Sequence, residues 1–319
     1  MDGFLGGDLM TQSHINGGGA LLAAEAYLPG QAFAEWRPAE DRLVHKVSAA
    51  ANFIARWRST CENTAELTAS WAAEQEYHCL ASQGMSDPML ALETFRQAVI
   101  IVAHSMYGVP LESAFSLQHI GISLDSCRMT GTPDLWLELT PDFSGTRLIG
   151  LGIRVTFRLD KAIIGTGRGK LIVLEQHSYH RVRNGAEPKE FRSPGLRAEA
   201  SHVGRTCEED VLLNEGGGDL LINTSHKWLF DHPADHIPGM LVIDAARQAF
   251  ALNRGGDPSF NVISARFFNY GELHEPVQIA TDVPDGPSGD ECSFIFKQLG
   301  RTLAIVAISS THSGQASLP

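Results

Sequence analysis

The chain has 319 residues, of which 43% are hydrophobic and 19% charged, and its mean hydropathy is close to zero. This length suits two domains of roughly 130 to 150 residues, each with its own core. The net charge of -12 disfavours nucleic-acid binding, which needs a basic face to displace counterions. The five cysteines form no Cys-x-x-Cys pair, which predicts free thiols and a cytoplasmic protein. No apolar stretch reaches the ~18 residues of a membrane span.

The chain begins with a segment rich in glycine and alanine, residues 1–42, which shows little periodicity. It lacks the basic and then apolar pattern of a signal peptide. We expect an N-terminal leader here, with one short helix over residues 21–27.

A repeated motif decides the organisation of the rest. Residues 87–98 read DPMLALETFRQA and residues 238–249 read PGMLVIDAARQA, and the two align when Met89 is placed on Met240. The polar positions then coincide as three pairs of like chemistry: Glu93 with Asp244, Arg96 with Arg247, and Gln97 with Gln248. Two unrelated amphipathic helices would share apolar positions and not these. The sequence therefore predicts two copies of one domain.

The same elements are expected around each motif. Helices are predicted over 89–106 and 240–252, and both are apolar nearly all round, which is typical of buried helices. Strand-like runs come before the helices at 65–77 and 219–229, and after them at 117–125, 134–140 and 168–179 and at 260–269, 276–283 and 301–312. The glycine-rich residues 165–169 are predicted to form a β-turn, because no helix follows to make a phosphate loop.

This order of elements predicts an α+β fold in which each copy is an antiparallel sheet wrapped around one long helix. Such an arrangement in tandem is a double hotdog. The first repeat is placed at residues 43–182 and the second at 201–313. The polar residues 183–200, rich in charge, glycine and proline, are expected to form the linker.

The motif places a carboxylate, an arginine and a glutamine on one face of each helix, since they are three and four residues apart. Ionisable groups on a buried helix are costly unless they are paired. Two interpretations stay open. One is an ion pair that fixes the helix to its neighbours, and the other is a site in which a carboxylate acts as a base or as a substrate ligand, where the perturbed pKa expected of a buried carboxylate would suit a base. Pro238 breaks the chain before the second helix, so the N–H groups of Gly239 and Met240 are expected to be free to polarise a carbonyl.

His232 and His236 have the spacing of metal ligands on a helix, but Pro233 and Pro238 prevent a helix here. We therefore expect no metal. Either one of these histidines is an active-site residue, or both are loop residues that bond to the backbone. A Gly-x-Ser-x-Gly elbow is absent from the sequence, which disfavours an α/β-hydrolase.

The second motif resembles the hotdog dehydratase pattern, although His232 lies two residues closer to the Pro-Gly than that pattern has it. The closer resemblance is to the A-factor biosynthesis hotdog family, over roughly residues 43–312. The family's DP-L-ETxRQA motif is matched by Asp87-Pro88 and residues 93–98, its DHxPGM-EAARQA motif by residues 235–249, and its His-Lys opening by His45-Lys46. The departures are Asp244, where glutamate is usual, and the leader.

The resemblance implies an acyltransferase that moves a β-ketoacyl group from an acyl carrier protein thioester to the hydroxyl of dihydroxyacetone phosphate, for a γ-butyrolactone-type signalling molecule. It implies Glu93 and Arg247 as the catalytic pair, one from each copy, facing one cleft. Glu93 is expected to orient or deprotonate the hydroxyl, and Arg247 to hold the phosphate. No metal or cofactor is required. The expected substrate-binding residues are Arg96, Gln97, His232, Gly239, Met240, Asp244 and Gln248.

An acidic carrier protein needs a basic landing patch, for which the sequence offers Arg181, Arg183 and Lys189; the alternative for each is a place on a solvated face. The chain is expected to act as a monomer that is a pseudo-dimer, or as a homodimer. Two alternatives stay open at this point, a thioesterase or dehydratase on the same fold, and a non-catalytic acyl-binding regulator. In a thioesterase the acyl acceptor would be water, and Arg247 would then have no phosphate to bind.

Overall fold

The computed structural model describes residues 35–71, 77, 79–80, 85–86, 88–125, 131–282 and 291–310. Most of the predicted leader, including the helix expected over 21–27, lies outside these residues. The described helices are α1 (Met89–Tyr107), α2 (Gln176–Val182) and α3 (Gly239–Asn253). Four short 3-10 helices are η1 (Asp41–Val44), η2 (Ala49–Ala51), η3 (Ala200–Val203) and η4 (Glu208–Asp210). None of the described helices has the length and apolar composition to cross a membrane.

The strands of the first half are β1 (Arg37–Pro38), β2 (Ile54–Cys61), β3 (Thr64–Ala69), β4 (Cys79–Leu80), β5 (Met85–Ser86), β6 (Ala114–Leu124), β7 (Asp134–Ser144), β8 (Arg147–Leu159) and β9 (Ala162–Leu174). Those of the second half are β10 (Val262–Phe267), β11 (Gln278–Asp282), β12 (Glu291–Gln298) and β13 (Arg301–Ser309). Only β4 and β5 lie outside the main sheet, as a pair of their own.

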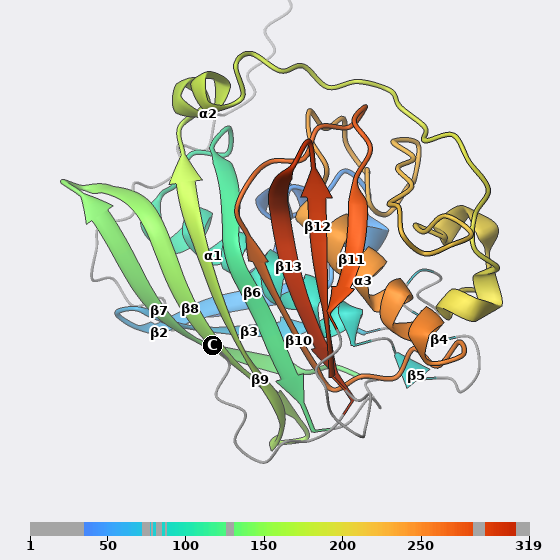
Figure 1. Ribbon diagram of the computed structural model, residues 1–319. Coiled ribbons are helices and arrows are strands. Elements are labelled where there is room, and N and C mark those ends of the chain that lie inside the picture. Colours follow the sequence, from blue (N-terminus) through green and yellow to red (C-terminus); the bar gives the residue numbers. More distant parts are fainter. Residues whose placement is uncertain are drawn as a thin grey trace, which may run out of the picture.

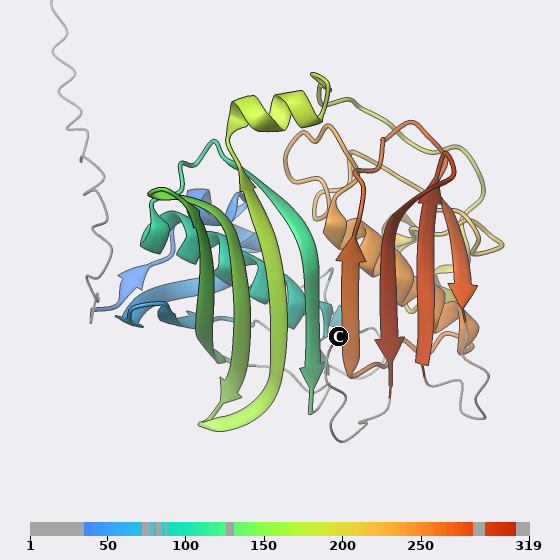
Figure 2. The ribbon, with the colours of Figure 1, turned by 60° about the vertical axis from the view of Figure 1, so that its left-hand side comes forward.

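The other described strands form one 11-stranded antiparallel sheet, in the order β1-β2-β3-β7-β8-β9-β6-β10-β13-β12-β11. β6 and β10 join the two repeats in antiparallel register, with Ile120 opposite Ala265. On either side of this junction the order β6-β9-β8-β7 is mirrored by β10-β13-β12-β11. Figure 2 shows the two half-sheets side by side, with α1 and α3 on the same side of the sheet. The α+β double hotdog fold is confirmed.

Both central helices are buried as predicted, because nearly every face carries apolar side chains. In α1 only three residues of 19 escape full burial, and the helix ends at Gly108, whose φ of 63° suits glycine. The facing strand β8 buries alternate residues, among them Leu151, Ile153 and Val155, against α1. One apolar core runs through both repeats.

Two of the expected strands are wrong. Residues 219–229 form only isolated bridges, such as Leu213 with Leu220, because their backbone groups bond to loops, as Thr224 does to Phe191. The run over 168–179 ends as a strand at Leu174, and α2 follows. The predicted linker, residues 183–200, is irregular and packs on the second repeat (Figure 1), with Arg192 bridged to Asn223.

The predicted β-turn at residues 165–169 is also wrong, since these residues lie inside β9. The chain reverses earlier, at Asp160 and Lys161, which both have positive φ. Inside β9 the glycines allow close approach of strands. A Cβ at Gly167 would lie 2.8 Å from the carbonyl oxygen of Gly121 and 2.8 Å from Cγ1 of Val155.

Gly167→Ala is therefore expected to lower the free energy of unfolding by about 1–3 kcal/mol, because backbone atoms that cannot move meet the new methyl group. Gly152→Ala on β8 is the matched control, since its Cβ would meet Thr140 at an ordinary 3.5 Å. Urea denaturation of both variants measures the difference. Equal stability of the two variants would contradict the conclusion that Gly167 is needed for the close approach of the neighbouring strands.

Candidate active site

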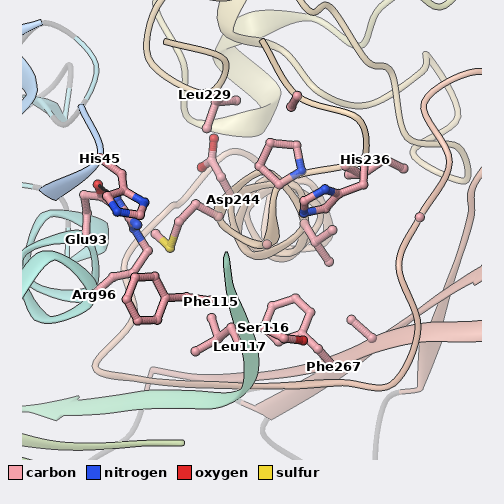
Figure 3. Close-up of a pocket in the computed structure, with 18 of the residues that line it drawn as sticks. His45, Glu93, Arg96, Phe115, Ser116, Leu117, Leu229, His236, Asp244 and Phe267 are labelled. Carbon is pink, nitrogen blue, oxygen red and sulfur yellow. Dashed lines mark hydrogen bonds and ion pairs between the residues drawn. The ribbon is translucent and has the colours of Figure 1, made fainter. Parts of the chain in front are cut away.

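A cavity of about 380 Å³ opens between α1, α3 and the strands of the junction. Both repeats contribute to its wall. Figure 3 shows His45, Glu93 and Arg96 on one side of it, His236 on the opposite side, and Asp244 between them. The remaining wall is largely apolar and includes Phe115, Leu117, Leu229 and Phe267. The cavity is therefore polar at its two ends and apolar along its floor.

The first polar end centres on Glu93, one turn into α1. Arg96 donates to both of its carboxylate oxygens, from Nε at 2.8 Å and from Nη2 at 2.8 Å. Nζ of Lys46 lies 3.6 Å from Oε1 of Glu93 and 3.7 Å from Oδ1 of Asp231. Asp231 comes from the loop that leads to α3, so this cluster joins the two repeats.

This pairing fixes the charge of Glu93. Burial opposes ionisation, but the charges of Arg96 and Lys46 and hydrogen bonds from Arg96 and Gln97 outweigh it, and the pKa of Glu93 falls well below its ordinary value. The expectation that burial would shift this pKa to suit a general base is therefore wrong. Glu93 is an anion that holds cations and accepts hydrogen bonds.

Gln97 and Gln248 do not line the cavity. Gln97 is fully buried, accepts the N–H of Phe53 and donates to the carbonyl of Ala51. Gln248, also fully buried, makes the same pair of bonds, to Leu212 and Asp210. Each glutamine thus ties its helix to the loop before it, and the structure places both in a supporting position.

This equivalence reveals a second internal repeat, which the helix motif alone did not show. Residues 41–53 and 200–212 share a 3-10 helix, a left-handed residue and a second 3-10 helix. The alignment places Lys46 on Arg205, and both pair with the carboxylate of the central helix. Arg205 was missed in the sequence because its separation from Lys46 differs from that of the helix motif.

The second copy of the cluster is closed. Arg205 donates to Asp244 at 2.6 Å, and the hydroxyl of Tyr77, from the first repeat, donates to the same carboxylate. Burial opposes its ionisation, but Arg205 and Arg247 lower the pKa of Asp244 below its ordinary value. Asp244 borders the cavity and is nevertheless fully buried beneath these partners.

Arg247 lies away from the cavity. It is fully buried, and its guanidinium donates to the carbonyls of Val203 and Gly204, with Asp244 at 3.9 Å. The structure therefore does not bring Arg247 and Glu93 to one cleft, because the face of α3 that carries Arg247 packs against η3. Through these hydrogen bonds, Arg247 supports the loop that contains Arg205.

The loop before α3 supplies the rest of the polar wall. His232 is exposed and its Nδ1 lies 2.8 Å from Asp231. Gly239 and Met240 form the first turn of α3 and line the cavity. Within the described part of the chain, their backbone N–H groups have no hydrogen-bond acceptor, so they are available to a ligand.

The other polar end is built on Asp235. It accepts from His236 at 2.7 Å, from the hydroxyl of Tyr179 on α2 at 2.6 Å, and from Nε of Arg183 at 3.0 Å. Arg183 also pairs with Glu272 at 2.7 Å and is buried. Arg183 is thus unavailable to a carrier protein, in contrast to what its charge alone predicted.

A smaller cavity of about 70 Å³ continues the apolar floor. It shares Arg96, Ile100, Phe115 and Leu117 with the larger one and ends at β8 and β9. Among the described residues, no group of three or more histidine, cysteine, aspartate or glutamate side chains is placed to bind a metal ion. The site therefore offers charges, helix amides and an apolar channel.

Comparison with known proteins bears on this site. A synthase of Streptomyces virginiae, named 2-oxo-3-(phosphooxy)propyl 3-oxoalkanoate synthase, is 32% identical over 266 residues, covering 78% of this chain and 88% of that protein. A protein of the same name from Streptomyces coelicolor is 29% identical and covers 79% of this chain and 84% of its own length. An acyl-ACP thioesterase structure from Bacteroides thetaiotaomicron aligns with a TM-score of 0.47 and 9% identity, over 77% of this chain and 97% of that one.

The sequence model of the A-factor biosynthesis hotdog domain matches the chain twice, at residues 32–175 and 187–311. Each match contains one central helix and the strands that follow it. The chain belongs to the A-factor biosynthesis hotdog family.

Proposed function

We propose that this chain is an acyltransferase that moves a 3-oxoacyl group from an acyl carrier protein thioester to the hydroxyl of dihydroxyacetone phosphate. The product is the phosphorylated ester after which its Streptomyces relatives are named. One observation carries the proposal on the structural side. Two cations, Lys46 and Arg96, stand at one polar end of a cavity whose floor is apolar, as a phosphorylated acceptor and an acyl chain require.

Lys46 and Arg96 have donors to spare for a phosphate. Glu93 occupies Nε and one N–H of Nη2 of Arg96, so the other side of the guanidinium is uncommitted. The ammonium of Lys46 lies 3.6 Å from Glu93 and 3.7 Å from Asp231, beyond hydrogen-bonding distance, and it makes no hydrogen bond with any described residue. A phosphate between the two cations would gain charge-assisted bonds from both.

Glu93 and the first turn of α3 would then act on the reacting groups. The Glu93 carboxylate holds Arg96 and Lys46 in place, and so positions the acceptor through its phosphate. The free N–H groups of Gly239 and Met240 stabilise the negative charge that develops on the thioester carbonyl oxygen. We assign Arg247 and Gln97 a positioning role, because neither reaches the cavity. The apolar floor and the smaller cavity hold the acyl chain.

The carrier protein would approach the end of the cavity at His236, whose loop is bonded to Tyr179 on α2. Arg181 on α2 and Lys189 beyond it are exposed and remain candidates for an acidic partner, whereas Arg183 is buried. Both repeats of one chain contribute to the cavity, so a monomer suffices for the reaction. Carrier-protein thioesters are cytoplasmic substrates, and we place the enzyme there.

The direct test is mass spectrometry of the purified protein incubated with a 3-oxoacyl carrier protein thioester and dihydroxyacetone phosphate. The expected product is the phosphorylated 3-oxoacyl ester, formed only when both substrates are present. Free 3-oxo acid, released equally well without dihydroxyacetone phosphate, would identify a thioesterase. Absence of any turnover of a bound thioester would identify an acyl-binding regulator.

The two carboxylates of the repeated motif are expected to differ in role. Glu93→Gln should reduce kcat by about 100-fold, since an amide keeps the shape and loses the charge that holds Arg96, so the acceptor is misplaced. Asp244→Asn should lower the free energy of unfolding by about 3 kcal/mol, because it leaves Arg205 buried without a counter-ion. Steady-state kinetics and urea denaturation of both variants separate the effects, and the reverse pattern would refute the assignment.

Loss of a cation should weaken acceptor binding. Lys46→Met is expected to raise the KM for dihydroxyacetone phosphate about 10- to 100-fold, which corresponds to the roughly 1.5–3 kcal/mol of a hydrogen bond to a charged group. The KM for the thioester should change little. Lys297→Met, an exposed lysine on β12, is the control. An unchanged KM for dihydroxyacetone phosphate would exclude Lys46 from the phosphate site.

The smaller cavity should set the preferred chain length. Gly169 lines it, and a Cβ there would lie 3.2 Å from Cζ of Phe95, so Gly169→Ala shortens the channel. Each methylene that is no longer buried lowers kcat/KM about fourfold, from roughly 0.8 kcal/mol. Rates measured for a series of 3-oxoacyl thioesters should therefore shift towards shorter chains. The Gly152→Ala variant should keep the chain-length preference of the wild type. If Gly169→Ala also keeps that preference, the acyl chain lies outside the smaller cavity.

A further inference from the structure

His45 adopts a backbone conformation that side chains seldom tolerate. Its φ of 55° and ψ of 40° are left-handed, and it ends the helix η1. At the equivalent place after η3 the second repeat has Gly204, with φ of 67° and ψ of 32°. The same turn thus carries glycine in the repeat whose cluster around Asp244 is closed, and histidine in the repeat whose cluster around Glu93 is open. A side chain kept in an unfavourable conformation at a site points to a role for that side chain.

Hydrogen bonds determine which nitrogen of His45 carries the proton. Nδ1 of His104 lies 2.7 Å from the carbonyl oxygen of Val109, and a carbonyl only accepts, so Nδ1 of His104 bears hydrogen. In neutral His104, Nε2 is then a bare acceptor. Nε2 of His45 lies 2.8 Å from it and must be the donor. The remaining nitrogen of a neutral His45 ring, Nδ1, is left with a free lone pair.

The ring of His45 borders the cavity next to Glu93 and Arg96 (Figure 3). Phe115 packs against it, with ring centroids 5.5 Å apart, and fixes its plane. Nδ1 makes no hydrogen bond with any residue that the structure describes. It is an unused acceptor at the end of the cavity where the acceptor hydroxyl is expected.

We propose that Nδ1 of His45 is the base that removes the proton from the acceptor hydroxyl, with His104 as its positioning residue. The inference rests on the proposed acyltransferase function. In this step the hydroxyl oxygen bonds to the thioester carbonyl carbon while its proton passes to Nδ1. The carbon–sulfur bond then breaks, and the proton passes from His45 to the departing thiolate, so the ring ends neutral.

The charges around His45 are consistent with this step. Burial, then His104, Arg96 and His232 lower its pKa to about 4, which keeps the ring neutral and able to accept a proton at neutral pH. The charged and titratable groups nearest to it come from α1, from its own loop and from the loop before α3: Glu93, Arg96, His104, Lys46, Asp231 and His232. A bound phosphate adds negative charge and raises this pKa towards the working range of a base.

The main test replaces His45 with asparagine, which tolerates the left-handed conformation and cannot take the proton. His45→Asn should reduce kcat by about 10²- to 10⁴-fold, as expected for loss of a general base, with the KM for dihydroxyacetone phosphate nearly unchanged. The control is His202→Asn, which changes an exposed histidine on η3. His236→Asn changes the histidine at the opposite end of the cavity and tests the alternative position of the base.

A second measurement determines which ring nitrogen of His45 carries the proton. Nitrogen-15 chemical shifts of labelled protein at neutral pH should show Nε2 of His45 protonated and Nδ1 bare. His104→Phe removes the acceptor, so it should mix the two ring forms and lower kcat, whereas His104→Gln, which keeps an acceptor, should retain most of the activity.

Retention of kcat within threefold by His45→Asn, or a protonated Nδ1 in the spectrum, would overturn the assignment. So would a rise confined to the KM for dihydroxyacetone phosphate, which would make His45 a binding residue. A larger loss of kcat in His236→Asn than in His45→Asn would move the base to the other end of the cavity. Each of these outcomes requires that the wild type form the phosphorylated ester. A wild type that releases only free acid refutes the proposed function itself.

Discussion

The structure depends on the stabilisation of a carboxylate on each of two buried central helices. A carboxylate in an apolar core is costly unless cations and hydrogen-bond donors surround it. Glu93 obtains them from Arg96 on its own helix and from Lys46 on the loop before it, and Asp244 from Arg205 on the equivalent loop. Each helix and the loop that precedes it therefore form one unit, fastened by a buried glutamine. Both units line the cavity, one through Glu93 and Arg96 and the other through Asp244.

The two units stabilise their carboxylates in different ways. Because of this difference, the two repeats form one site and not two equivalent sites. Around Asp244 the arginine and the Tyr77 hydroxyl bond the carboxylate directly, and the group is sealed. Around Glu93 the shorter reach of Lys46 leaves its ammonium 3.6 Å away, with its donors uncommitted. The open cluster keeps unused hydrogen-bonding capacity for a ligand, whereas the closed cluster contributes stability. An asymmetric cavity with one charged end follows from this.

The junction of β6 and β10 makes the cavity possible. Antiparallel pairing there relates the repeats by an approximate twofold arrangement, which brings the loop before α3 opposite the first turns of α1. Asp231 reaches Lys46, and the first turn of α3 faces the same space as Glu93. The groups that would bind a phosphate and those that would stabilise an oxyanion thus come from different repeats of one chain.

The sequence alone determined the two repeats, the two buried helices, the antiparallel sheet and the place of Glu93 beside Arg96. These features follow from spacing along the chain, because side chains three or four residues apart share one face of a helix and apolar periodicity marks burial. Only the tertiary structure decided which face of each helix meets the cavity. α3 turns Arg247 towards η3 and away from Glu93, and the close approach of β6 and β9 places Gly167 in a strand where a turn was expected. Similarly, the proton positions of His45 depend on His104, 59 residues away in sequence. Contacts between distant segments set these features, and local spacing does not encode them.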